Sequence, residues 1–131
     1  MKQHIGPSQL AELSDEQKEK LRQWWEPQKG DMVSRGSESQ LCVGVDNNNL
    51  YFERESSKHY FAYLPLLSIG QCIELLDSYL TYLKLSEYSG QWEVRMFSVP
   101  GVSSHGMGRL PCSFSADDLI DALWQAVKEV I

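Results

Sequence analysis

Three strand-like segments follow one another between residues 41 and 64, and only short polar turns separate them. They cover residues 41–45, 50–54 and 59–64, and they are rich in the β-branched and aromatic residues that favour strands. Turns this short join antiparallel strands, whereas parallel strands need a crossover of about a dozen residues or more. The sequence therefore predicts an antiparallel meander, whose first turn holds Asp46 and the asparagines after it.

Ser14 and Gln17 predict the start of a helix, because a serine N-cap and a glutamine three residues later form a capping box. The helix is expected over residues 15–25. It should end before Pro27, since a proline pushes the preceding residue out of helical angles. Its apolar face is thin, which indicates a peripheral helix.

The same pair of residue types recurs at Ser68 and Gln71, ahead of apolar residues with helical spacing. This pattern predicts a core helix over residues 69–84. A last helix is expected over residues 116–131, with Ser115 as its cap.

Residues 91–97 alternate between apolar and polar side chains, which predicts a half-buried strand. The expected elements then follow the order α-β-β-β-α-β-α. Strands that come in a run favour an α+β fold, here an antiparallel sheet of about four strands with helices packed on one face. We expect residues 1–131 to form a single domain, with residues 1–13 as a flexible N-terminal segment.

Composition excludes several classes of protein. With 42% hydrophobic and 23% charged residues, the chain is too apolar to be disordered and too polar for a membrane protein. A net charge of −6 argues against non-specific nucleic-acid binding, which depends on Lys and Arg. No segment reads as a signal peptide, so Cys42, Cys72 and Cys112 are expected to be reduced thiols in the cytoplasm.

A glycine-rich stretch over residues 101–109 is the most suggestive loop. Its glycines let the backbone approach a ligand, Arg109 can hold an anion, and Ser103, Ser104 and His105 supply groups for hydrolysis. The stretch lacks the full pattern of a Walker loop, a dinucleotide fingerprint or a nucleophile elbow. An ordinary surface loop is therefore the favoured interpretation.

Metal-ligand spacing is missing from the sequence, which contains no Cys-x-x-Cys and no His-x-x-x-His. Asp117 and Asp121 lie four residues apart in the last predicted helix, a spacing that could bind a divalent cation. The favoured interpretation is that these carboxylates, in the first turn, interact with the positive end of the helix dipole. We therefore expect no metal and no cofactor.

Aromatic and basic side chains form a second kind of candidate site. A base-stacking platform on the predicted strands would combine aromatic rings with basic side chains. Its members would be Tyr51, Phe52, Tyr60, Phe61, Tyr63 and Trp92, with Arg54, Lys58 and Arg95. Aromatic residues of strands more often pack a sheet face, and the acidic net charge weakens this interpretation.

Trp24 and Trp25 are candidates for contact with a protein partner, because tryptophan is enriched at interface hot spots. Successive helix residues point about 100° apart, so the two indoles cannot share one buried face. Residues 1–27 are therefore the first candidate for a self-association surface.

Three stretches of the chain carry a resemblance to known proteins. Residues 25–31 read Trp-x-Pro-Gln-x-Gly-Asp, residues 64–71 read Leu-Pro-Leu-Leu-Ser-Ile-Gly-Gln, and residues 121–127 read Asp-Ala-Leu-Trp-x-Ala-Val. Together they resemble small uncharacterised proteins encoded by phages and prophages of Gram-positive bacteria. The resemblance implies a prophage gene, and it brings no activity and no catalytic residue.

The leading hypothesis for function is an accessory protein that acts by protein–protein contact without catalysis, with a partner or as a homo-oligomer. The alternative is a phage nucleic-acid module that binds single strands through sheet aromatics. A small hydrolase built on the loop of residues 101–109 ranks third, because no base is identified beside its serines.

Overall fold

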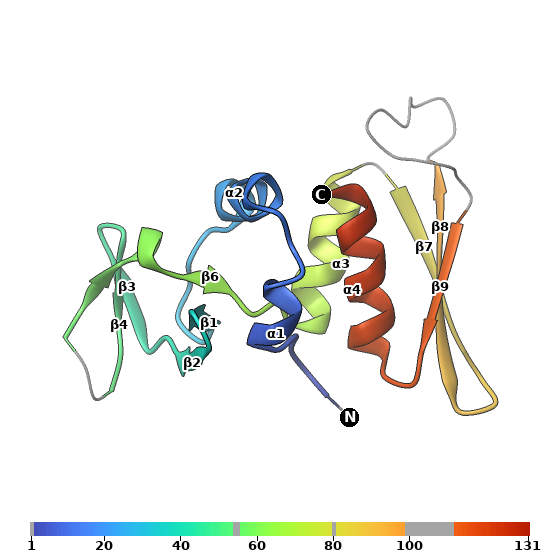
Figure 1. The fold of residues 1–131 in the computed structure, drawn as a ribbon, viewed down its shortest axis with the longest axis horizontal. Helices are drawn as coiled ribbons and strands as arrows, with labels where there is room; N and C mark the ends of the chain where they lie inside the picture. Colours follow the sequence, from blue (N-terminus) through green and yellow to red (C-terminus); the bar gives the residue numbers. More distant parts are fainter. Residues whose placement is uncertain (1, 54–55, 80, 99–111) are drawn as a thin grey trace. The chain divides into compact units, whose positions relative to one another are not determined.

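The computed structural model describes residues 2–53, 56–79, 81–98 and 112–131 (Figure 1). The chain divides into two compact units. The C-terminal unit consists of Met1–Ile5 and Ser68–Ile131, and the N-terminal unit consists of Gly6–Leu67.

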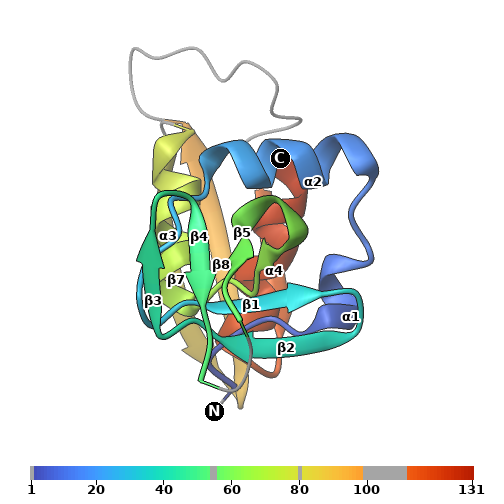
Figure 2. The same ribbon diagram turned by 90° about the vertical axis from the view of Figure 1, so that its left-hand side faces the viewer.

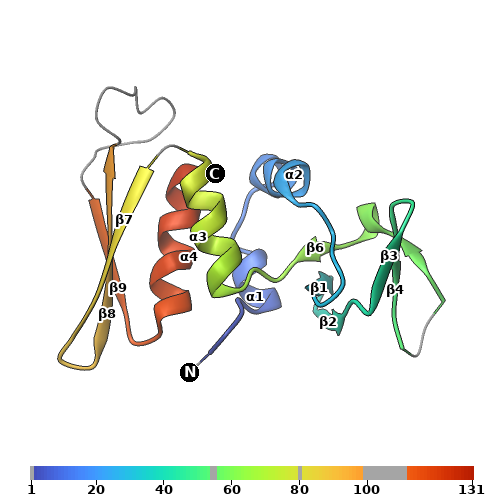
Figure 3. The ribbon, with the colours of Figure 1, turned by 180° about the vertical axis from the view of Figure 1, so that it is seen from behind.

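The C-terminal unit is an antiparallel three-stranded sheet of order β7-β8-β9 with two helices packed against it. Its elements are α3 (Ile69–Ser78), β7 (Thr81–Tyr88), β8 (Gln91–Ser98), β9 (Cys112–Ala116) and α4 (Leu119–Val130). α3 packs on β7, α4 packs on β8 and β9, and both helices lie on the same side of the sheet (Figure 3). This arrangement is α+β, as predicted, although the sheet has three strands.

β8 and α4 provide much of the core of this unit. Val94 and Met96 are fully buried while Arg95 between them is exposed, which confirms the half-buried strand predicted over residues 91–97. Burying an aliphatic side chain of this size contributes roughly 1.5–3 kcal/mol. In α4, Trp124 is 1% exposed and belongs to the core of this unit.

The predicted helix over residues 69–84 is too long. α3 begins as predicted, with the Ser68 hydroxyl accepting the Gln71 N–H at 3.1 Å, but the helix ends at Ser78. The following residues form β7, which pairs with β8 along all eight of its residues. Leucines in this segment satisfy helical and strand spacing alike, and the long ladder with β8 decides between them.

The predicted start of the last helix is also wrong. Ser115 lies in β9, where it pairs with Glu93 of β8, and α4 begins only at Leu119 with Asp118 as its N-cap. Ser115 and Asp118 have the three-residue spacing of a capping box, but Ser115 belongs to a strand and Asp118 to the bend before the helix. Asp117 precedes the helix, so it does not form a helical pair with Asp121.

The N-terminal unit contains two small antiparallel sheets and three short helical segments (Figure 2). Its helical segments are α1 (Pro7–Leu10), α2 (Asp15–Trp24) and the 3-10 helix η1 (Tyr60–Ala62). One sheet, of order β2-β1-β6, is formed by β1 (Met32–Arg35), β2 (Glu38–Leu41) and β6 (Leu64–Pro65). The other, of order β3-β4-β5, is formed by β3 (Gly44–Asp46), β4 (Asn49–Tyr51) and β5 (Lys58–His59).

The helix predicted from Ser14 and Gln17 is confirmed. The Ser14 hydroxyl accepts the Gln17 N–H at 3.1 Å, and the Gln17 side chain accepts the Ser14 N–H at 2.9 Å. Upstream, Leu10 and Leu13 are buried.

Within the ranges that the structure describes, three separate three-stranded sheets replace the predicted sheet of about four strands, and the element order differs accordingly. The turn after Asp46 is confirmed, since Asn47 and Asn48 have φ angles of 47° and 68° in the left-handed region. Residues 35–40, whose polar and glycine-containing sequence suggests a loop or a hairpin tip, contain the turn of the hairpin between β1 and β2. The strand expected over residues 59–64 is interrupted by η1.

Residues 25–31 form a tight turn that leads from α2 to β1. Asp31 and Gln28 hold each other, because the Gln28 N–H donates to Asp31 Oδ2 at 3.0 Å and the Asp31 N–H donates to Gln28 O at 3.1 Å. Gly30 has a φ of 96°, which glycine adopts without a steric penalty. The turn pairs with Cys42, which accepts from the Gly30 N–H at 2.8 Å. The Trp-x-Pro-Gln-x-Gly-Asp pattern thus has a structural role in this chain.

The core of the N-terminal unit brings residues from several elements together. Its fully buried members are Trp25, Val33, Cys42, Leu50 and Tyr63. Trp24, Phe52 and Tyr60 pack against this cluster while half-buried. No helix in the described ranges combines the length and apolar character needed to cross a bilayer.

Candidate functional site

Three consecutive rings stack beside β5. The centroid of the His59 ring lies 5.1 Å from that of Tyr60 and 4.7 Å from that of Phe61, and the Tyr60 and Phe61 centroids are 4.4 Å apart. The His59 Nδ1 accepts the Phe61 N–H at 3.3 Å, which fixes the turn between them. The stack is therefore set by local backbone geometry, and η1 holds its rings close.

The register of the β3-β4-β5 sheet places Tyr51 on the same face as His59. Asp46 pairs with Asn49, which pairs with His59, so the three side chains point to one side. Tyr51 lies two residues from Asn49 on β4 and points to the same side. Leu50 points to the opposite side and is fully buried.

Exposed apolar side chains concentrate in this part of the chain. Seven large hydrophobic residues are exposed among those that the structure describes, and five of them lie within residues 41–61. These five are Leu41, Val43, Val45, Tyr51 and Phe61. Phe61 is 59% exposed and Tyr51 is 40% exposed, so both rings are available to a partner. We call Tyr51, His59 and Phe61 the aromatic face.

Acidic side chains accompany the aromatic face. Asp46 is exposed on the same side of the sheet, and Glu53 is exposed just beyond β4. Gly44 is the cross-strand partner of Tyr51 and has no side chain, so no neighbouring side chain from Gly44 covers the Tyr51 ring. The face therefore combines flat rings with negative charge at its border.

The structure places three of the predicted interaction residues in the core cluster of the N-terminal unit. Trp25 is 4% exposed and packs edge-on against Tyr60, with ring centroids 6.2 Å apart. Trp24 and Tyr60 are half-buried against the same cluster. Of the residues predicted for interaction in this unit, Tyr51 is the one that points outward from its sheet with an exposed ring.

The predicted base-stacking platform is divided between two sheets. Tyr51 and Tyr60 belong to the N-terminal unit, whereas Trp92 and Arg95 lie on β8 in the C-terminal unit. Arg95 Nε is 2.6 Å from Glu93 Oε1, so its charge is already paired. The platform predicted from the sequence therefore draws on residues of both units. Arg54, predicted to belong to it, lies outside the described residues.

The glycine-rich loop also lies outside the described residues. The candidate side chains of this loop are Ser103, Ser104, His105 and Arg109. Their role in binding or hydrolysis stays a prediction. Within the described ranges there is no group of three or more Cys, His, Asp or Glu side chains placed to hold a metal ion.

The sequence patterns do not single out His59 as a site residue, and they place Phe61 only in the predicted base-stacking platform. They assign residues 59–64 to one strand, where alternate side chains face opposite sides. The 3-10 helix η1 breaks that alternation and brings three successive rings together. The run of three rings in the sequence, His59-Tyr60-Phe61, is the feature from which this cluster could have been predicted.

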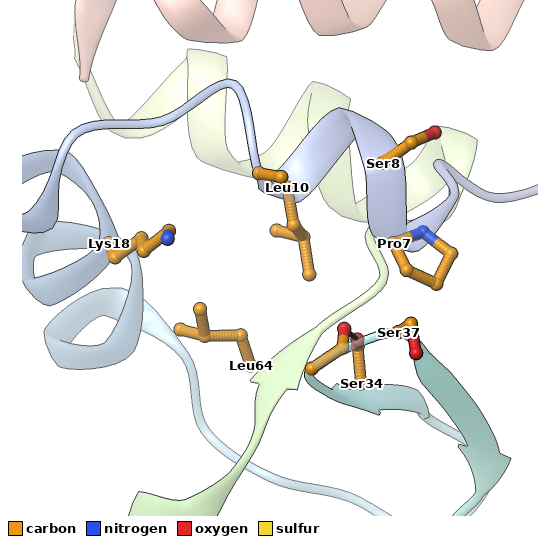
Figure 4. A pocket seen from close by; sticks show the side chains of 9 residues that line it. Pro7, Ser8, Leu10, Lys18, Ser34, Ser37 and Leu64 are labelled. Atoms are coloured by element: carbon orange, nitrogen blue, oxygen red, sulfur yellow. Dashed lines mark hydrogen bonds between the residues drawn. The ribbon is translucent and has the colours of Figure 1, made fainter.

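A cavity of about 410 Å³ lies within the N-terminal unit, among α1, α2, β1 and β6 (Figure 4). Its lining is mostly apolar, with Pro7, Leu10 and Leu64 as its largest apolar side chains. The polar groups around it come from Lys18 and from three serines, Ser8, Ser34 and Ser37. No sequence pattern indicates this cavity, because its walls come from segments far apart in the chain.

The three cysteines are free thiols. Cys42 and Cys72 are buried, and burial raises the pKa of the Cys72 thiol to about 12. For Cys112, burial and, to a lesser extent, the Glu129 carboxylate raise the pKa above its ordinary value. Neither Cys72 nor Cys112 is therefore an activated nucleophile near neutral pH.

The chain matches no protein-family model, and no curated protein or solved structure is significantly similar to it. Function therefore has to be inferred from the geometry of the described residues.

Proposed function

We propose that the chain is a prophage accessory protein that acts by protein–protein contact, without catalysis, and that the aromatic face binds a basic segment of its partner. The observation that carries this proposal is the exposed ring of Phe61 stacked on His59, on the sheet side that also presents Tyr51. Prophage origin rests on the resemblance of residues 25–31, 64–71 and 121–127 to phage-encoded proteins.

Ring faces and carboxylates together favour an arginine-containing partner. A guanidinium group stacks on aromatic faces, and each such contact at an exposed site contributes about 0.5–1 kcal/mol. Asp46 points to the same side as His59 and offers a carboxylate for the same guanidinium. The net charge of −6 attracts a basic partner from a distance and opposes the approach of a second copy.

Charge speaks against single-stranded nucleic acid at this face. Binding of a strand needs cationic side chains along its phosphates as well as rings for its bases. Residues 41–63 carry three acids and two bases, and of those bases only Lys58 lies within the described residues. Lys58 pairs with Leu50, on the side of the sheet opposite the aromatic face.

Selection of peptides from a random display library on the immobilised chain tests the proposal. We expect the enriched sequences to carry arginine beside apolar residues. A labelled peptide from the selection should lose roughly two- to fivefold in affinity to Phe61→Ala, which corresponds to one ring contact of about 0.5–1 kcal/mol. Fluorescence anisotropy measures this affinity.

Tyr88→Ala is the matched control, because Tyr88 is 81% exposed and lies on β7 in the other unit. It should leave the affinity unchanged. Enrichment of acidic peptides, or affinity equal for Phe61→Ala and the unmodified chain, would show that the proposed face is not the binding surface. Salt-sensitive binding of an oligothymidine in a gel shift would favour the nucleic-acid alternative instead.

A further inference from the structure

The cavity of the N-terminal unit is bounded by elements whose positions are fixed by packing and pairing. Ser34 and Leu64 are partners in the β1–β6 ladder, and together they form one wall. Leu10, at the end of α1, is 4% exposed and forms another. The volume of about 410 Å³ falls within the range of roughly 300–1,000 Å³ that is usual for small-molecule sites.

Lys18 reaches the cavity from α2. In Figure 4 the ends of Lys18, Leu10 and Leu64 point toward one another across the hollow, while the Ser8 hydroxyl points away. Lys18 is half-buried. Among the described residues, its ammonium group has no ion-pair or hydrogen-bond partner. A cation at the border of apolar walls is complementary to an anion that carries an apolar group.

Ser34 is the buried polar residue of this wall, with 5% of its surface exposed. Its hydroxyl donates to the Gly36 carbonyl at 3.0 Å, so the oxygen keeps its ability to accept a hydrogen bond. Ser37 adds a second hydroxyl on the β1–β2 side of the cavity.

We propose that this cavity binds a small aliphatic carboxylate, with the carboxylate at Lys18 and the aliphatic group between Leu10 and Leu64. One lysine matches the single charge of a carboxylate, whereas a phosphate would leave excess negative charge in an apolar site. The inference is independent of the aromatic face, since the two sites share no residue.

Two chemical sources can supply such a group, and two probes distinguish them. Octanoate represents a free acyl chain, and N-acetyl-L-leucine represents the C-terminal end of a peptide. Each is compared with its neutral amide, which keeps the shape and loses the charge. Titration of the isotope-labelled full chain is followed by two-dimensional NMR of its backbone amides.

We expect at least one of the acids to shift the amide signals of Ser34, Gly36, Ser37 and Leu64 and to bind at least roughly tenfold more tightly than its amide. Lys18→Gln should remove this preference. Lys20→Gln is the matched control, because Lys20 lies on the same helix, outside the cavity lining, and is exposed. Ala11→Trp, at an exposed position of the lining, should weaken binding of each acid that the unmodified chain binds, without unfolding the chain.

The preferred acid then identifies the source of the ligand. Saturable binding of octanoate alone would assign the cavity to acyl chains, and binding of N-acetyl-L-leucine alone would assign it to peptide ends. Absence of shifts with both acids would overturn the proposal. Equal affinity for acid and amide, no effect of Lys18→Gln, or shifts confined to residues away from the cavity would overturn it as well.

Discussion

The indole Nε1 of Trp25 donates to Asp31 Oδ2 over 3.0 Å, across the turn that joins α2 to β1. The same carboxylate oxygen also accepts the Gln28 N–H, so one side chain holds both the buried indole and the turn backbone. Because Trp25 is a core residue, the Asp31 carboxylate links the surface turn to the packing of the N-terminal unit.

Asp31→Ala should destabilise the chain by about 1–3 kcal/mol, because a buried indole N–H would lose its acceptor. The measurement is the free energy of unfolding in urea, with Trp fluorescence as the signal. Glu26→Ala removes a neighbouring exposed carboxylate and should change that free energy by less than about 0.5 kcal/mol. Equal effects of the two substitutions would show that the Trp25–Asp31 bond adds nothing to stability.

Phe61→Ala and Tyr63→Ala should differ in their effect on the free energy of unfolding, because the first residue is exposed and the second is buried. Phe61 is 59% exposed, so its removal should cost less than about 0.5 kcal/mol of unfolding free energy. Tyr63 is 2% exposed and its ring lies 5.2 Å from that of Phe52, so its removal should cost about 3–5 kcal/mol, as for other large buried rings. A large loss with Phe61→Ala would place that ring in the core and would remove the basis of the aromatic face.

The sequence predicts a structural element correctly where one interaction between residues close in the chain determines it. Both serine–glutamine capping boxes form, since each depends on residues three apart in the chain. The turn at Asn47 likewise follows from residues that tolerate positive φ.

The sequence does not predict features that depend on contacts between residues far apart in the chain. Leu83 fits the predicted helix by its spacing, but its pairing with Met96 places it in a strand. The cavity could not be foreseen for the same reason, because Lys18 and Leu64 meet only in the folded unit. Similarly, the place of the rings beside β5 depends on the 3-10 turn η1.

Cys72 should make the chain less stable at alkaline pH. Its thiol has a pKa of about 12 in the folded chain against an ordinary value of 9.0, because burial disfavours the thiolate. The unfolded chain therefore releases this proton first. The contribution to stability is complete below pH 9 and is lost as the pH rises toward 12, at about 1.4 kcal/mol per pH unit.

Cys72→Ala provides the comparison for this effect. Urea unfolding at about pH 8 and about pH 10.5 should show that the advantage of the unmodified chain over Cys72→Ala narrows by roughly 2 kcal/mol between them. All other side chains are the same in the two proteins, so their contributions cancel in the difference. A constant difference at the two pH values would contradict the raised pKa of Cys72.

Glu129→Gln should make Cys112 more reactive. The pKa of this thiol is raised by burial first and by the Glu129 carboxylate second, so removing the carboxylate lowers the pKa and increases the fraction of thiolate. We expect iodoacetamide to alkylate Cys112 faster near pH 8, although the lower intrinsic nucleophilicity of the thiolate offsets part of the gain. Peptide mapping by mass spectrometry assigns the rate to Cys112 rather than to the buried Cys72. Glu87→Gln removes an exposed carboxylate of β7 and should leave the rate unchanged, whereas equal acceleration by both substitutions would show a general charge effect.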